Sequence, residues 1–419
     1  MLSHLLLAVP VLLLGCSEGA RDARESAALG TSSEGTESSP PGDEVDYAAV
    51  ARTVVTQNAR VRTGDLVTLF GSPRDMQLLE DMTIEVLKAG AHPLLQTGSE
   101  RLQRRIYDDV PAKFDTVTPA FGLKLAGIRT VHIGVEVQES DTAFAGVPAE
   151  RLLARGKATL PITQLMNKRG VRRVFLGNGM YPTEAAARRY GMDRDELARL
   201  FWSGVNVDYS QLQATGERIR KTLAAGRELR LTNPNGTDFR MGISGRPVYV
   251  SDGVISAEDE RRGGAATIVW LPAGEVLIAP VPGSAQGVII ADRMHVEGKT
   301  VERLRLEFRA GKMTSMTAQS GLERIQSFYD GAGPRKDEFG LVDIGINPNV
   351  PFPKGSQLLN WVPSGMVSIQ VGNNLIAGGD NAVNFELSPF LPGSTLTVDG
   401  KAIVKDGVLQ GEGGGIANR

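Results

Sequence analysis

The first part of the chain alternates apolar runs with amphipathic stretches. Residues 66–70 are almost continuously apolar and predict a strand that is buried on both faces. Ser72 then offers a helix cap before Pro73, and apolar residues recur at helical spacing as far as Leu87. A second strand is predicted at 94–95. This strand–helix–strand order predicts parallel pairing of the two strands.

The same pattern continues to about residue 180. Strand signals recur at 128–137 and 171–176 with helical sequence between them, which predicts an open α/β sheet. Residues 182–225 are rich in Ala, Arg, Leu and Glu and predict two helices, separated at 206–208. The N-terminal part of the fold is therefore expected to be an α/β domain with a parallel sheet.

The pattern changes in the second half of the chain. Residues 227–241 predict a hairpin that turns at 233–236, and after about residue 245 short strands alternate with Gly and Pro. Residues 320–329 are the one clear helical stretch there. We therefore predict an α/β N-terminal domain at 47–245 and an α+β C-terminal domain at 246–409.

The two ends of the chain differ from this folded body. Residues 1–15 form an apolar run too short to span a bilayer, and Cys16, the single cysteine, follows Gly15. This resembles the lipobox of a bacterial lipoprotein precursor. It implies a signal peptide at 1–15, a lipidated Cys16, and a location in the bacterial cell envelope, on the periplasmic face or the outer membrane. Residues 16–46 and 410–419 are expected to be a flexible tether and tail. The alternative is a chance cysteine.

Composition narrows the function. The 419 residues are 41% hydrophobic and 22% charged, enough for two domains with substantial cores. Lys and Arg total 46 against 48 Asp and Glu, a formal charge of −2, so no basic field favours nucleic acid as a partner. No glycine-rich nucleotide motif follows the first strand, and the sequence gives little support to nucleotide binding.

Glu275 is the first candidate functional residue. Within 271–280 it is the one carboxylate in an apolar stretch that has turn-forming residues at both ends. An ionised carboxylate is costly to bury unless a cation or hydrogen-bond donors meet it. Glu275 is therefore a candidate site residue, and the alternative is that it caps a turn and points into water.

Several motifs after Tyr47 point to one family. The segment 271–280 resembles the Leu-Pro-x-Gly-Glu-Val motif of the thermophilic-type metallo-aminopeptidases, the aminopeptidase T and aminopeptidase S family. Further similar motifs lie at 88–93, 182–184, 237–238, 308–312, 345–348, 378–381 and 398–401. The resemblance implies a two-domain, homodimeric exopeptidase with two divalent metals in the C-terminal domain, which activate water to attack the first peptide bond.

The metal ligands implied by this resemblance are mostly replaced. Glu275 stands at the family's first glutamate position, and no tyrosine stands near Leu375, where the family places its catalytic phenol. The other ligand positions fall on residues of different chemistry, namely Leu341, Ser368, Glu386 and Ser388. The chain thus keeps one ligand in five in identity.

Two interpretations of the remaining carboxylates stay open. Asp343 lies two residues from Leu341, so on a strand it faces the same side, and with Glu275 and Glu386 it would form an oxygen-only metal site. Otherwise Asp343 and Glu386 are ordinary residues of a degenerate pocket. Only four histidines are present, and His92 and His132 are expected to be structural.

Three functions follow. The first is a peptide- or protein-binding pseudoenzyme without a metal cofactor, anchored to the membrane by lipid. The second is a working aminopeptidase that uses Zn, Co, Mn or Mg in a rearranged carboxylate site. The third is a scaffold that acts through dimerisation.

Overall fold

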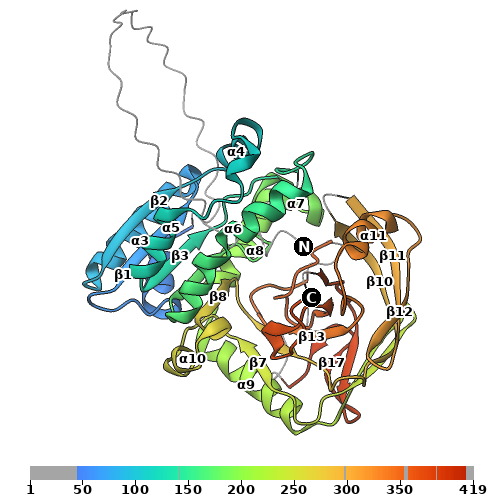
Figure 1. Ribbon diagram of the computed structural model, residues 1–419. Coiled ribbons are helices and arrows are strands. Elements are labelled where there is room, and N and C mark those ends of the chain that lie inside the picture. Colours follow the sequence, from blue (N-terminus) through green and yellow to red (C-terminus); the bar gives the residue numbers. More distant parts are fainter. Residues whose placement is uncertain (1–44, 141, 297–298, 353–356, 384, 412–419) are drawn as a thin grey trace, which may run out of the picture.

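The computed structural model describes residues 45–411, except 141, 297–298, 353–356 and 384. The predicted signal peptide, Cys16, nearly all of the tether and most of the tail lie outside these described residues. In the described part of the chain no helix has the length and apolar character needed to cross a membrane. Figure 1 shows the helix-rich N-terminal part, blue to green, beside the mainly β C-terminal part, yellow to red.

Sheet A is the parallel sheet that the N-terminal pattern predicts. Its five strands lie in the order β2-β1-β3-β4-β8, and every neighbouring pair is parallel. The strands are β1 (Leu66–Gly71), β2 (His92–Thr97), β3 (Val131–Val135), β4 (Arg172–Leu176) and β8 (Ile268–Leu271). The prediction of an α/β N-terminal fold is confirmed.

Helix α3 (Met76–Lys88) packs against β1 and β2 of sheet A. Ser72 caps the first turn after β1 by accepting from the Arg74 N–H at 3.4 Å, as the sequence predicts. Leu79 and Met82 of α3 are fully buried together with Leu69 of β1. The helical segments are α2 (Tyr47–Thr53), η1 (Val54–Asn58), η2 (Pro73–Asp75), α3 (Met76–Lys88), α4 (Glu100–Asp109), η3 (Ala112–Phe114), α5 (Ala120–Ile128) and α6 (Ala149–Lys168).

Three helices, not the two predicted, connect sheet A to the β-rich part. They are α7 (Glu184–Tyr190), α8 (Arg194–Val205) and α9 (Tyr209–Ala225). The predicted break at 206–208 is present, and Asp208 caps α9. The break that the sequence analysis missed arises because Gly191 ends α7 in the left-handed region, with φ +61°, and the Asp193 carboxylate caps α8.

Two antiparallel sheets form the rest of the fold. Sheet B has the order β12-β11-β10-β6-β5-β16-β17-β18, and sheet C has the order β15-β14-β13-β9-β7. The strands of sheet B are β5 (Glu228–Asn233), β6 (Thr237–Gly242), β10 (Gln286–Val296), β11 (Lys299–Arg309), β12 (Lys312–Thr317), β16 (Thr395–Val398), β17 (Lys401–Lys405) and β18 (Val408–Leu409). Those of sheet C are β7 (Val248–Ser251), β9 (Glu275–Ile278), β13 (Phe339–Gly345), β14 (Val367–Gly372) and β15 (Glu386–Leu387). Short helical segments between these strands are α10 (Ala257–Arg262), η4 (Gly264–Thr267), α11 (Leu322–Asp330) and η5 (Leu375–Ala377).

The three sheets share one hydrophobic core. A single cluster of buried apolar side chains includes Leu69 of sheet A, Phe239 of sheet B and Val342 of sheet C. The chain also does not leave sheet A for good at residue 245. Strands β5 and β6, before this residue, belong to sheet B, whereas the later β8 belongs to sheet A. The boundary between 47–245 and 246–409 stays a prediction, and the chain passes between the two parts more than once.

Candidate functional site

Glu275 lies where sheet A passes into sheet C. It is the first residue of β9, and only residues 272–274 separate it from the end of β8. Gly274 has φ +128°, and a Cβ there would meet the Asn347 backbone N at 2.9 Å, so the turn requires glycine. Asn178, in the turn after β4, donates to Glu275 Oε1 at 3.1 Å and to the Pro272 carbonyl at 2.9 Å. The carboxylate is therefore held by both sheets.

Asp343 faces the same side of sheet C as Glu275. Gly345 of β13 stands opposite Glu275 in the antiparallel register, and Asp343, two residues before Gly345, points to the same face. Its side chain is 1% exposed, and neither of its oxygens has a hydrogen-bond partner among the described residues. On the other neighbouring strand, β14, Ser368 pairs in register with Asp343 and is 2% exposed.

The two carboxyl groups perturb each other's titration. Burial raises the pKa of Glu275 to about 7, and the hydrogen bond from Asn178 opposes this shift. Burial, followed by the nearby charge of Glu275, raises the pKa of Asp343 well above its ordinary value. At neutral pH the pair therefore carries fewer than two negative charges.

Leu341, which the family resemblance assigns to a ligand position, has a purely apolar side chain. It lies two residues before Asp343 on β13 and is 2% exposed. Its buried neighbours form a small apolar cluster, separate from the main core, that consists of Leu277, Ala279, Leu341 and Ala377 with Tyr249 packed against them. Leu277 pairs in register with Asp343, so this apolar cluster lies beside that carboxylate.

Glu386 and Ser388 lie further along the sheet. Glu386 pairs in register with Gly372 of β14. Gly372 is four residues along β14 from Ser368, so these two residues are roughly 14 Å apart at the usual strand rise. Burial raises the pKa of Glu386, and Ser388 is 4% exposed. Within the described ranges no group of three or more His, Cys, Asp or Glu side chains is placed so that it could hold a metal ion.

Comparison with a family model shows to which protein family the chain belongs. The model of the thermophilic metalloproteases, M29, matches residues 44–343 of the chain. The chain belongs to the M29 thermophilic metalloprotease family. The resemblance found in the sequence motifs is confirmed. The matched residues end at Asp343, so the M29 match does not include Ser368, Glu386 or Ser388.

Solved structures with the same fold include an M29 enzyme. Wild-type AmpT from Thermus thermophilus superposes with a TM-score of 0.68 at 17% identity, covering 87% of this chain and 99% of AmpT. A 2,5-dihydroxypyridine dioxygenase from Pseudomonas putida KT2440 matches with a TM-score of 0.56 at 14% identity, covering 89% of this chain and 99% of that one. These likenesses show the fold. Comparison with curated proteins gave no match.

The residues of this M29 chain do not fit the two-metal centre that the family implies. M29 proteins are metal-dependent, and a two-metal site needs several carboxylate or imidazole ligands around both ions. Here Glu275 and Asp343 are the two carboxylates brought together, while Leu341 supplies no donor atom and packs against apolar neighbours. The predicted oxygen-only site of Glu275, Asp343 and Glu386 stays a prediction, although the structure does not gather the three into one cluster.

The predicted structural histidines lie away from this site. His132 in β3 of sheet A is 2% exposed and its Nδ1 lies 2.8 Å from the Thr68 hydroxyl. His92 begins β2, and His295 lies in β10 of sheet B. None of these three strands belongs to sheet C.

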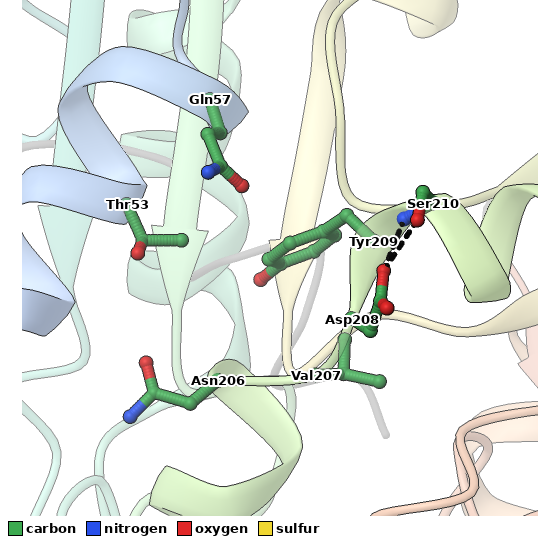
Figure 2. Close-up of a pocket in the computed structure, with 7 residues that line it drawn as sticks. All are labelled: Thr53, Gln57, Asn206, Val207, Asp208, Tyr209 and Ser210. Atoms are coloured by element: carbon green, nitrogen blue, oxygen red, sulfur yellow. Dashed lines mark hydrogen bonds between the residues drawn. The ribbon is translucent and has the colours of Figure 1, made fainter.

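Sequence analysis of this M29 chain did not find two features. One is Asn178, whose signal was the Gly-Asn-Gly turn at 177–179 directly after a buried strand. The other is a cavity of about 350 Å³, shown in Figure 2, which is lined by Thr53, Gln57, Asn206, Val207, Asp208, Tyr209 and Ser210. Asp208 in this cavity accepts from the N–H and the hydroxyl of Ser210, at 2.9 and 2.6 Å, so its carboxylate is engaged as a helix cap. The cavity contains none of the predicted site residues.

Proposed function

We propose that this M29 chain binds a peptide or a protein partner and does not hydrolyse it. The observation that supports this proposal is the burial of Leu341 among Leu277, Ala279, Ala377 and Tyr249, where the family places a metal-binding glutamate. A ligand cannot be regained there by a rotamer change, because leucine has no donor atom. The packing of sheet C around Leu341 therefore supports the loss of a metal ligand at this position.

The protonation of the carboxylate pair supports the same proposal. Two buried carboxylates normally need a cation, but a raised pKa lets one of them hold a proton instead. The pKa of Glu275 rises to about 7 and that of Asp343 rises well above its ordinary value. The fold can thus keep both residues at neutral pH without a metal.

A second candidate function is a metal-dependent aminopeptidase with a rearranged site. It is favoured by the two oxygens of Asp343, which are buried beside Glu275 and lack partners in the described structure. Zn, Co, Mn or Mg is the cofactor in this case, with hard ions such as Mn or Mg best suited to carboxylates. The fold does not choose between the two functions, since a fold can host unrelated chemistries.

One experiment separates these functions. The protein is loaded with Co, Zn, Mn or Mg, freed of excess ion, and assayed for bound metal and for release of the first residue from peptides with a free amino terminus. We expect no stoichiometric metal and no turnover, together with measurable binding of some peptides by calorimetry. Stoichiometric metal with turnover that is lost in Glu275→Ala, and kept in the surface variant Glu80→Ala, would establish the enzyme instead.

We also propose that the chain is a lipid-anchored homodimer of the bacterial cell envelope. The support is the lipobox-like Leu-Leu-Gly-Cys sequence at 13–16 and the family resemblance. Cys16→Ala should release the protein from the membrane fraction of a bacterial host, whereas Ser17→Ala should not. Sedimentation of the released protein as a monomer would contradict the dimer.

A further inference from the structure

A row of polar side chains crosses one face of sheet A. Thr68 of β1 pairs in register with His132 of β3, which pairs in register with Arg173 of β4. Residues paired in this way present their side chains on the same face of a parallel sheet. Arg129, the residue directly after α5, extends to this row, and its Nη1 lies 3.2 Å from Thr68 Oγ1 and 3.3 Å from His132 Nδ1.

The two arginines of this row are buried and incompletely bonded. Arg129 is 1% exposed and Arg173 is 3% exposed. Nε and Nη2 of Arg129, and Nε of Arg173, have no hydrogen-bond partner in the described part of the chain. The Arg173 Nη2 donates to the Asn167 side chain, which is neutral. Buried N–H groups without acceptors are rare, and each is costly in a folded protein.

The row also lacks a counter-charge. Burial lowers the pKa of Arg129 to about 10, and burial together with the charge of Arg129 lowers that of Arg173 to about 10. Both groups remain charged at neutral pH, and among the described residues no acidic neighbour contributes to either pKa. His132 adds no charge, because burial and the two arginines lower its pKa to about 3. The carbonyl end of α5 supplies only a partial negative charge.

Arg172, the neighbour of Arg173 in β4, is a buried arginine that does have a carboxylate partner. Its side chain points to the opposite face, where its Nη2 donates to Asp65 Oδ2 at 2.6 Å and its Nη1 donates to the Ala59 carbonyl at 3.0 Å. On this face of sheet A, the buried arginine therefore meets the carboxylate of Asp65. On the other face, no carboxylate among the described residues meets Arg129 or Arg173.

We propose that sheet A holds a small monovalent inorganic anion, of halide size, between Arg129 and Arg173. The anion accepts from the unpartnered N–H groups of both guanidiniums and supplies the missing negative charge. It must be small because both arginines are almost completely enclosed. Water is the competing occupant, but water leaves two buried like charges uncompensated. The proposal does not depend on the function proposed for sheet C.

Halide titration of the whole protein tests the proposal. The protein is dialysed into gluconate, which is too large for the enclosed space, and chloride, bromide or nitrate replaces gluconate at constant ionic strength. The unfolding temperature should rise with the logarithm of the halide concentration above a dissociation constant, because a ligand of the native state stabilises it by mass action. The same temperature throughout the titration would overturn the proposal.

A variant and a direct observation locate the anion. Arg173→Met should abolish the dependence on halide, while the exposed Arg188→Met, in the same part of the chain, should keep it. If Arg173→Met does not fold, anomalous scattering from crystals of the unaltered protein in bromide decides. A bromide peak within hydrogen-bond reach of both guanidiniums supports the proposal. A map that shows only water there, or no peak, refutes it.

Discussion

Two buried clusters of like charge in this protein solve the same physical problem in different ways. In sheet C, the carboxyl groups of Glu275 and Asp343 are buried beside each other, and in sheet A, the guanidiniums of Arg129 and Arg173 are buried beside each other with no acidic partner among the described residues. A buried carboxylate can take up a proton near neutral pH, whereas both guanidiniums stay protonated there. The acidic pair can therefore lower its own charge by taking up a proton. The basic pair keeps its charge and depends on the proposed anion.

Protonation lowers the charge of the acidic pair, so the fold can bury Glu275 and Asp343 together beside the apolar cluster of Leu341. The basic pair offers no such adjustment. Four substitutions test the comparison, from the largest expected effect to the smallest.

Arg172→Met should have the largest effect. It removes the partner of Asp65, whose side chain is 11% exposed, and leaves a buried charge without compensation. We expect the free energy of unfolding to fall by about 3–5 kcal/mol in urea titrations. Arg173→Met in low chloride is the matched control on the same strand, and it should cost far less. Equal losses for the two variants would contradict the contrast between the two faces of β4.

Leu341→Glu should come next. It restores the residue type of the M29 ligand position but places a carboxyl group in the cluster of Leu277, Ala279 and Ala377. Without metal we expect a loss of about 3 kcal/mol, because a polar group replaces a buried apolar one. Leu341→Met, which conserves volume, should cost less. Recovery of the lost stability on adding Zn or Co would show that the rest of the metal site is still intact.

Glu275→Gln tests the sign of the pH dependence. The pKa of Glu275 in the folded protein, about 7, is above its ordinary value of 4.5, so the folded state binds the proton more tightly than the unfolded state. The contribution of Glu275 to stability should therefore be fully present below pH 4.5 and be lost as the pH rises through 7. At pH 8 the variant should be more stable by about 3 kcal/mol, and near pH 4.5 the two should be nearly equal.

Urea unfolding at pH 5 and pH 8 measures this difference. Glu80→Gln, on the exposed side of α3, is the control and should leave the pH profile unchanged. A native protein that is more stable than Glu275→Gln at pH 8 would mean that a bound cation stabilises the ionised carboxylate. That outcome would favour the rearranged metal site.

Arg230→Met should have the smallest effect. Arg230 pairs with Asp238 across β5 and β6 through two hydrogen bonds of 2.9 and 3.0 Å, but both side chains are more than half exposed. Exposed ion pairs contribute little because water competes for both partners. The unfolding temperature should stay close to that of the native protein. A large drop would show that exposed pairs matter here as much as buried ones.

Local sequence signals predicted much of the fold. Ser72 with Pro73, the break at 206–208 and the turn at 233–236 depend on nearby residues, and the structure has each of them. The extra break at Gly191 was missed because a single glycine in a helical stretch need not end a helix. The return of β8 to sheet A was missed because pairing between distant strands leaves no local pattern.

The candidate site was less predictable for the same reason. The sequence placed Asp343 and Leu341 on one face of a strand, which needed only the two-residue period. It could not show that Leu341 clusters with Ala377, or that Arg172 pairs with Asp65 while Arg173 has no carboxylate partner among the described residues. These contacts join residues from different elements, and their partners become visible only in the folded chain.

The short connection at 272–274 has a consequence for how this architecture can be inherited. Glu275 follows β8 directly, Asn178 from β4 reaches its carboxylate, and β5 and β6 complete sheet B from before residue 245. A gene fragment that encodes 246–409 alone would therefore lack the amide that holds Glu275 and two central strands of its largest sheet. Recombination at residue 245 should yield insoluble products, so the two halves are expected to change together in evolution.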